Sequence, residues 1–284
     1  MSTSLRFPEP KEYVIEVTSL TKKIAFFDSG IGGLTVLHKA LQQFPEESYI
    51  YYADTLHVPY GTKSADEVRG YILGCIEAIA RQNVEAIVIA CNTATSLAVS
   101  ELRSRYDIPI IGMEPAVKPA VEMNRDNGKR VLVFATALTL SQTKYNELVS
   151  RVDDEHRVDS LALPELVEWC EQLQFDPVTI AAYFRSKLSR LDMEQYGTVV
   201  MGCTHYPFFS SILRGVLPDH VQIVDGSAGT VNHLKQRLAL QTLRHDTGGG
   251  IGKQEDVTFL SSSGRIEDQR KMRIALQYLK ENSL

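Results

Sequence analysis

The chain has 284 residues, enough for about two domains of ordinary size. Apolar residues make up 44% and charged residues 23% of the chain, which is usual for a globular protein with a large core. The net charge of -5 and the sequence pI of about 5.8, with no run of Lys and Arg, argue against nucleic acid as the main partner.

Membrane and export signals are weak in this sequence. No apolar stretch approaches the roughly 20 residues that a helix needs to span a bilayer. Residues 1–22 are polar and Pro-bearing and lack the continuous apolar segment of a secretory signal. We therefore expect a cytoplasmic protein that does not contact the membrane, with residues 1–22 as an N-terminal extension.

The predicted elements alternate strand and helix almost throughout. In chain order they are a strand at 23–27, a helix at 33–43, a strand at 49–53, a helix at 65–82, a strand at 86–90, a helix at 94–105, and strands at 108–112, 131–135, 198–201 and 222–224. Short β-branched runs of this kind suit strands that are covered on both faces. The repeated order predicts an α/β protein with parallel sheets and right-handed crossovers.

Two further segments have distinct patterns. Residues 208–217 place apolar side chains at i, i+3, i+4, i+7 and i+8, which predicts one helical face. Residues 245–255 (HDTGGGIGKQE) are Gly-rich, but Thr247 and Gln254 stand where a phosphate-binding P-loop needs Gly and Ser or Thr. We expect a surface connection there.

Four cysteines are present, and the sequence separates them into two kinds. None forms a C-x-x-C pair and no His cluster completes a zinc spacing, so we expect no metal and, in a reducing cytosol, free thiols. Cys75 lies within a helical apolar pattern and Cys170 follows Trp169, which favours packing roles for both.

Cys91 and Cys203 share one local pattern. Each follows an apolar strand, precedes two polar residues and then a helix. Ligands of open parallel sheets bind beyond the carboxyl ends of the strands, and a helix N-terminus favours a thiolate. A packing role for each cysteine, or a disulfide between the two, remains an alternative. Two thiols in equivalent places suit the inversion of a stereocentre, in which one takes a proton from one face and the other delivers a proton to the opposite face.

Four motifs in this order resemble those of the glutamate racemases, within the wider aspartate/glutamate racemase superfamily. They are Asp28-Ser-Gly-Ile-Gly-Gly33, Pro59-Tyr-Gly61, Ala90-Cys-Asn-Thr-Ala94 and Gly202-Cys-Thr-His-Tyr-Pro207. The resemblance implies two α/β domains with pseudo-two-fold symmetry and the active site between them. We place the first domain at 23–114 plus 225–284 and the second at 115–224. The resemblance also implies cofactor-independent interconversion of L- and D-glutamate. This reaction supplies D-glutamate for peptidoglycan, and so for cell wall biogenesis and cell shape.

The resemblance assigns Cys91 and Cys203 as the catalytic thiols, Asp28 as the helper of Cys91 and His205 as the helper of Cys203. A thiol with a pKa of about 8.5 is only partly ionised at neutral pH, so each needs a nearby base. The family's supporting Glu aligns with Glu171, although Leu163 replaces the usual Cys and Glu165 and Glu168 lie close by. Asp28 as a helix cap and His205 as a structural residue remain alternatives.

Substrate recognition needs donors for two carboxylates and a site for the ammonium group. Residues of the same motifs offer them, with Thr136 after the strand at 131–135 in the place of a family threonine, although Ser and Thr at strand ends also cap helices. The predicted binding residues are Asp28, Ser29, Tyr60, Gly61, Asn92, Thr93, Thr136, Thr204 and His205. Asp54, after the second strand, either faces the cleft or belongs to a loop.

Other functions stay open at this point. A racemase of aspartate or another amino acid would carry similar cysteine motifs, and a non-catalytic amino-acid-binding protein would use the same cleft. Some racemases with an N-terminal extension respond to a cell-wall precursor, whereas a tail without a regulatory role is the alternative for residues 1–22. Homodimers are the family's habit and the commonest symmetric assembly.

Overall fold

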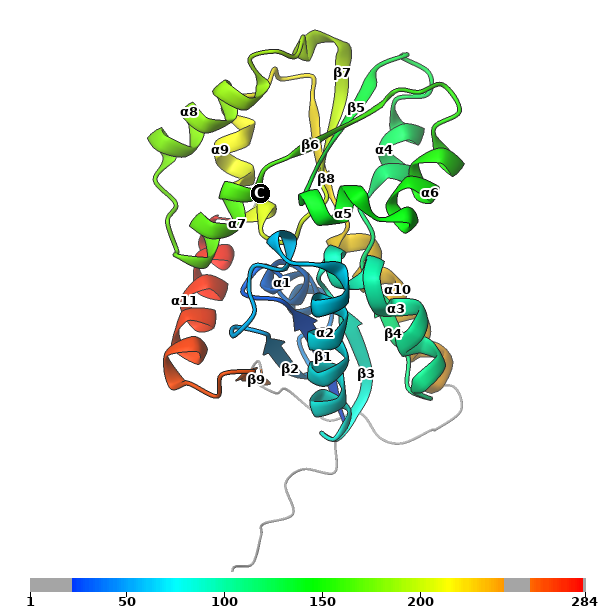
Figure 1. The fold of residues 1–284 in the computed structure, drawn as a ribbon, viewed down its shortest axis with the longest axis vertical. Coiled ribbons are helices and arrows are strands. Elements are labelled where there is room, and N and C mark those ends of the chain that lie inside the picture. The colour runs from blue at the N-terminus through cyan, green and yellow to red at the C-terminus, as the bar shows by residue number, and fades with distance from the viewer. Residues whose placement is uncertain (1–21, 243–255, 283–284) are drawn as a thin grey trace, which may run out of the picture.

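The computed structural model describes residues 22–242 and 256–282, which form two parallel β-sheets with helices on their faces (Figure 1). The predicted extension, except Lys22, and the Gly-rich segment 245–255 lie outside the described residues. The prediction of an α/β fold with two parallel sheets is confirmed.

The first sheet has the strand order β4-β3-β1-β2-β9. Its strands are β1 (Lys23–Asp28), β2 (Ser48–Ala53), β3 (Val84–Ile89), β4 (Ile110–Gly112) and β9 (Asp256–Ser261). Its helices are α1 (Leu34–Gln43), α2 (Ala65–Ala80), α3 (Asn92–Arg105), α10 (Ser227–Thr242) and α11 (Ile266–Asn282), with a 3-10 turn, η1, at Tyr60–Thr62. Phe26 and Phe27 of β1 enter two different core clusters, because alternate side chains of a strand point to opposite faces.

The second sheet has the order β6-β5-β7-β8. Its strands are β5 (Arg130–Ala135), β6 (Val158–Ala162), β7 (Tyr196–Met201) and β8 (Gln222–Asp225). Its helices are α4 (Val117–Met123), α5 (Ala137–Ser141), α6 (Thr143–Val152), α7 (Pro164–Glu171), α8 (Pro177–Leu188) and α9 (Ser210–Arg214), with 3-10 turns η2 (Met193–Gln195) and η3 (Tyr206–Phe209). Val133 and Phe134 again belong to separate clusters, so this sheet is also covered on both faces.

The two sheets repeat one topology. Strands β1 to β4 occupy the order 4-3-1-2, and strands β5 to β8 occupy the equivalent order 8-7-5-6. Cys91 follows β3 and Cys203 follows β7, so the two cysteines stand at equivalent places. The carboxyl ends of the two sets of strands face each other across the junction in the middle of the molecule (Figure 1). The exact domain boundaries stay a prediction.

Some elements differ from the sequence prediction. The helical pattern at 208–217 divides into η3 and α9, and the α-helix ends at Arg214. Gly215 follows Arg214, and Pro218 disfavours a helical conformation at Leu217, although Leu213 and Leu217 are buried as the pattern requires. Strands β6 and β9 lack a long apolar run, and for this reason the sequence pattern does not predict them.

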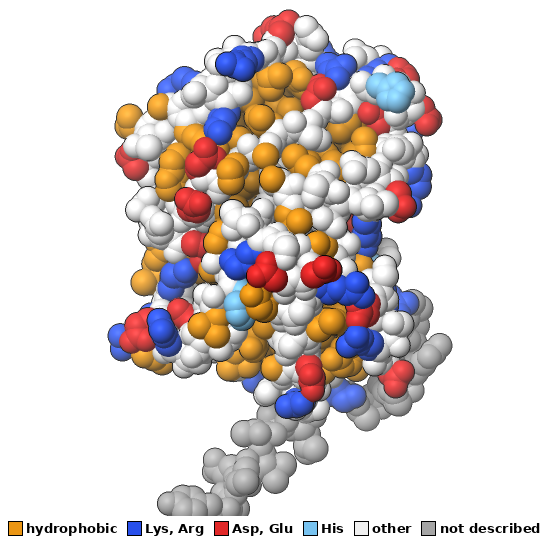
Figure 2. All heavy atoms as spheres, in the orientation of Figure 1, with side chains coloured by type: hydrophobic (Ala, Val, Ile, Leu, Met, Phe, Trp, Pro, Cys, Tyr) orange, Lys and Arg blue, Asp and Glu red, His pale blue; other side chains and the backbone are white. Residues whose placement is uncertain are grey.

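The surface agrees with the mixed composition. Acidic and basic side chains are interspersed over the face shown in Figure 2, and no basic stripe crosses that face. Among the described residues, no helix is both long and apolar enough to cross a bilayer.

Candidate active site

A cavity of about 220 Å³ lies at the junction of the two sheets. Its walls come from the segments that follow β1, β3, β5 and β7, together with η1 and α7. This volume is below the roughly 300–1,000 Å³ of sites for drug-sized ligands, so it suits a small metabolite. The predicted residues that line it are Ser29, Tyr60, Gly61, Cys91, Asn92, Thr93, Thr136, Cys203, Thr204 and His205. Asp28 and Glu171 stand behind this wall.

Cys91 is buried at the N-cap of α3. Its Sγ accepts the backbone N–H of Ala94 at 3.4 Å and lies 3.9 Å from Ser29 Oγ. Burial raises the pKa of the Cys91 thiol, and the negative charge of Asp28 raises it further, whereas the Ala94 N–H opposes the shift. Cys91 is therefore mainly a thiol at neutral pH, and it needs a partner to accept its proton.

Asp28 is fully buried at the end of β1. One carboxylate oxygen accepts the N–H of Gly30 at 2.9 Å, and the other accepts the hydroxyl of Thr204 at 3.1 Å, from the second sheet. Burial raises the pKa of Asp28, and the nearby His205 opposes this rise. Asp28 is thus held by hydrogen bonds from both halves of the site.

Cys203 begins a chain of polar contacts. Its Sγ lies 3.7 Å from His205 Nδ1, and His205 Nε2 lies 2.8 Å from Glu171 Oε1. Burial alone would lower the pKa of His205, but its bonds to Cys203 and Glu171 raise that pKa well above the usual value. Burial would also raise the pKa of Glu171, but His205 and Lys271 lower it to about 2. The arrangement favours a protonated imidazole beside Cys203.

The three acidic residues of α7 have separate surroundings. Glu165 accepts hydrogen bonds from Tyr183 at 2.5 Å and from Lys187 at 3.1 Å, away from His205. Glu168 lines the cavity. Glu171 is the one that contacts His205.

Glycines of the Asp28–Gly33 segment let the second sheet approach the first. A Cβ atom on Gly30 would lie 1.8 Å from Glu171 Oε1, and one on Gly32 would lie 2.4 Å from His205 Nδ1. The backbone N–H of Ile31 donates to Glu171 Oε1 at 2.7 Å. Only residues without a side chain allow this contact between the two halves.

Hydroxyl and amide groups complete the cavity. Thr93 Oγ1 lies 3.1 Å from Thr136 Oγ1 and 2.9 Å from Thr139 Oγ1, which joins the two halves on the side away from His205. Among the described residues, Asn92 Oδ1 is a buried polar atom without a hydrogen-bond partner. A ligand with a donor group would satisfy it, since buried polar atoms are nearly always paired.

Asp54 does not face the cavity. It is fully buried and accepts hydrogen bonds from Tyr60 Oη at 2.6 Å and from His57 Nδ1 at 2.8 Å. It therefore holds the Tyr60 ring from behind. Thr139 and Lys271 are two further residues of the site that the sequence does not predict, because nothing in their local sequence separates them from ordinary helix residues.

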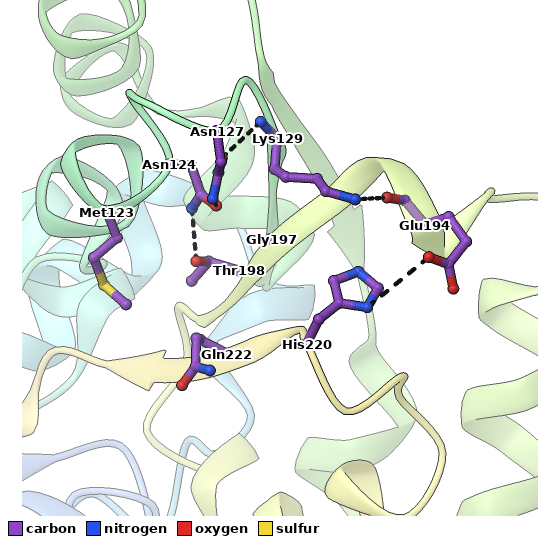
Figure 3. Close-up of a pocket in the computed structure, with 9 residues that line it drawn as sticks. All are labelled: Met123, Asn124, Asn127, Lys129, Glu194, Gly197, Thr198, His220 and Gln222. Atoms are coloured by element: carbon purple, nitrogen blue, oxygen red, sulfur yellow. Dashed lines mark hydrogen bonds and ion pairs between the residues drawn. The ribbon is translucent and has the colours of Figure 1, made fainter.

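A second hollow, of about 470 Å³, lies at the opposite edge of the second sheet (Figure 3). It surrounds the amino ends of β7 and β8, where ligands of parallel sheets do not usually bind. Its polar groups pair with one another: Asn124 donates to Thr198 at 2.7 Å, and Lys129 donates to the carbonyl of Glu194. Within the described residues, no group of three or more His, Cys, Asp or Glu side chains could hold a metal ion.

Known proteins are similar to this chain in both sequence and fold. Residues 31–234 match the model of the Asp/Glu/Hydantoin racemase family. The chain belongs to this family. Its similarity is high to a glutamate racemase of Halothermothrix orenii, with 49% identity over 91% of this chain and 99% of that protein. Glutamate racemase 2 of Bacillus subtilis is also 49% identical, over 87% of this chain and 91% of its own length.

Solved structures of relatives share the two-sheet architecture. The Escherichia coli glutamate racemase, in complex with L-glutamate and the activator UDP-MurNAc-ala, has a TM-score of 0.75 and 27% identity over 90% of this chain and 95% of that one. The Francisella tularensis enzyme, in complex with D-glutamate, has a TM-score of 0.75 and 26% identity over 90% and 94% of the two chains. The resemblance found in the four sequence motifs is thereby confirmed.

Replacing Asp28 by Asn tests the charge that acts on Cys91. The variant keeps an oxygen acceptor but removes the negative charge, so the pKa of Cys91 should fall. We expect iodoacetamide to alkylate Cys91 several-fold faster than in the parent protein near pH 8. Peptide mass spectrometry measures the rate at each cysteine. Unchanged or slower alkylation of Cys91 would contradict the electrostatic account.

Replacing Gly32 by Ala tests the close approach of the two halves. The added methyl group must displace the His205 ring, so we expect slower alkylation of Cys203 in a folded protein. Gly74→Ala is the matched control, because a Cβ there meets nothing within 4 Å and Ala favours the α2 helix. Equal alkylation rates of Cys203 in both variants would show that the contact at Gly32 is unimportant.

Proposed function

We propose that this chain interconverts L- and D-glutamate without a cofactor, with Cys91 and Cys203 as the two acid–base groups. The observation that carries the proposal is that both thiols line one small cavity, at equivalent ends of two sheets with the same strand order. Relatives with bound L-glutamate and bound D-glutamate share the fold over 90% of this chain. A site that handles both enantiomers needs a proton-transfer group on each face of the α-carbon.

The reaction requires one thiolate and one thiol at a time. The thiolate takes the α-proton and becomes a thiol, which leaves the electron pair of the broken C–H bond on the α-carbon and its carboxylate. The other thiol then delivers its proton to the opposite face and becomes a thiolate. The product is the mirror image of the substrate, no atom is gained or lost, and the reverse reaction exchanges the two roles.

Each thiol has its own partner for proton exchange. On the Cys203 side, the imidazole of His205 holds a proton beside the sulfur, and Glu171 fixes the ring through the other nitrogen. On the Cys91 side, we propose that Asp28 exchanges a proton with the sulfur during turnover, although its charge raises the pKa of the resting thiol. The N-terminus of α3 stabilises the thiolate when it forms. The proposed catalytic residues are Cys91, Cys203, Asp28, His205 and Glu171.

Neutral polar side chains that line the cavity are the proposed substrate-binding groups. We propose that Asn92 Oδ1 accepts a hydrogen bond from the substrate ammonium group, because that atom is buried and has no partner among the described residues. The hydroxyls of Ser29, Thr93, Thr136 and Thr204, and the segment Tyr60–Gly61, are then placed to bind the two carboxylates. Neutral donors in a buried site orient carboxylates without removing their charge.

The biological setting is part of the proposal. We propose that the enzyme acts in the cytoplasm, where free thiols persist, and supplies D-glutamate for peptidoglycan. A homodimer and activation by a cell-wall precursor are further proposals. The second is supported by the Escherichia coli relative in complex with UDP-MurNAc-ala. Sedimentation of the pure protein, and assays with and without that nucleotide, test these two points.

The direct test is incubation of the purified protein with L-glutamate alone. We expect D-glutamate to form after dialysis against EDTA and without pyridoxal phosphate, and to carry deuterium at the α-carbon in deuterium oxide. Either Cys91→Ala or Cys203→Ala should lower the rate by at least about a hundredfold. Cys75→Ala is the matched control, because Cys75 lies in α2 away from the cavity.

Three results would contradict parts of this proposal. Racemisation that survives the loss of either thiol would exclude the two-base mechanism. Turnover of aspartate or another amino acid in preference to glutamate would change the substrate. Ligand-induced stabilisation without turnover of any amino acid would indicate a binding protein.

A further inference from the structure

We propose that Lys271, on the C-terminal helix α11, is a positioning residue for the Cys203 half of the reaction. Its ammonium group holds Glu171 ionised and aimed at His205. The catalytic part of this proposal rests on the proposed racemase function. Helix α11 stands beside the first sheet and reaches α7 of the second half, so a side chain from one half completes the site of the other (Figure 1).

The two oxygens of the Glu171 carboxylate have separate partners. Oε2 accepts a hydrogen bond from Lys271 Nζ at 2.5 Å. Oε1 accepts the N–H of Ile31 at 2.7 Å and contacts His205 Nε2 at 2.8 Å. With one oxygen held by Lys271, the carboxylate cannot rotate without losing a charged contact, so the oxygen that faces His205 is fixed.

Lys271 also binds the main chain of Glu171. Its Nζ donates to the Glu171 carbonyl oxygen at 2.9 Å. Glu171 is the last residue of α7, where helix carbonyls lack partners and a cation is favourable. One ammonium group therefore fixes both the backbone and the side chain of Glu171.

Aromatic packing keeps α11 in place against the second half. Tyr278 of α11 stacks on Phe175 with ring centroids 4.1 Å apart, and its ring is 6.2 Å from that of Phe208. Met272, Ala275, Leu276 and Leu279 are buried in the same core cluster. The position of Lys271 is thus set by a rigid element and not by a surface loop.

The charges alternate along the chain of contacts. Lys271 is positive, Glu171 negative and protonated His205 positive, and the proposed reaction requires Cys203 to be an anion in one of its two states. Among the described residues, titratable groups that respond to the charge of Glu171 include Asp28, Tyr51 and Cys170, and Asp268 of α11 responds to the charge of Lys271. Without Lys271, this buried network would carry an excess negative charge, which disfavours a further anion at Cys203. The groups that shift the pKa of Cys91 in the described part of the chain are Asp28, Ala94, Cys203 and Ser29, and none of them is a cation, so the effect should be confined to Cys203.

The experiment compares Lys271→Met, Lys271→Gln and Lys271→Arg in the full chain. The first readout is the rate of alkylation of each cysteine by iodoacetamide, resolved by peptide mass spectrometry. We expect Met and Gln to slow alkylation of Cys203 by about three- to tenfold with Cys91 unchanged, and Arg to restore most of the rate. Arg270→Met, at an exposed position of the same helix, should leave both rates unchanged.

The second readout is the pH profile of kcat/KM for glutamate. One direction suffices, because two enantiomers of equal free energy require equal kcat/KM values. Lys271 helps to lower the pKa of Glu171 to about 2, so its removal raises that pKa and the ionised form is lost at higher pH on acidification. The loss of kcat/KM in the Met and Gln variants relative to the parent protein should therefore grow as the pH falls, and Arg should restore the parent profile.

The outcomes separate this inference from the proposed function. Cys203 alkylation at the parent rate in both neutral variants would overturn the role of Lys271, and so would equal slowing at Cys91 and Cys203. If the parent protein did not racemise glutamate, the proposed function would fail, and the alkylation rates would still decide whether Lys271 acts on Cys203. Gln keeps a donor at this position, so it provides the comparison if the Met variant does not fold.

Discussion

The contact between Glu171 and His205, buried where the two sheets meet, is the interaction on which the rest of the site depends. A buried carboxylate is costly unless every oxygen is paired. Here its partners come from both halves: the imidazole of His205, the N–H of Ile31 and the ammonium of Lys271. Gly30 and Gly32 are required because a side chain at either position would occupy the same space. The same contacts therefore hold the two sheets together and set the ionisation of the site.

The functional groups do not follow the pseudo-symmetry of the fold. The strand registers place Asp28 at the end of β1 where β5 has Ala135, and Thr93 after β3 where His205 follows β7. Cys91 consequently has a carboxylate, Asp28, and a helix N-terminus as its neighbours. Cys203 has the imidazole of His205, which the carboxylate of Glu171 and the ammonium of Lys271 hold in place. A symmetric task, the transfer of a proton on either face of one carbon, is thus performed by chemically different halves. The equal energy of the two enantiomers constrains the overall rates but not the means by which each thiol is activated.

Much of this organisation could be predicted from the sequence. The buried strands at β1, β3, β5 and β7 are continuous apolar runs, and residues that follow such strands in parallel sheets meet at one edge. The roles of α11 and Lys271 could not be predicted, because they depend on how the last helix packs against the far half. The choice among Glu165, Glu168 and Glu171 also needed the structure, since all three lie on one short helix and only its orientation decides which carboxylate reaches His205. The apolar pattern at 208–217 predicts one helical face, but periodicity alone does not include the effect of Pro218 on the conformation of the preceding residue.

A crystal structure of the protein with bound glutamate tests the central claim most directly. The account predicts that the α-carbon lies between the two sulfur atoms, with Cys91 Sγ and Cys203 Sγ on opposite faces and each about 3–4 Å from it. It also predicts that the ammonium group contacts Asn92. A substrate with both sulfurs on the same face of the α-carbon, or with one thiol out of reach of it, would contradict the account.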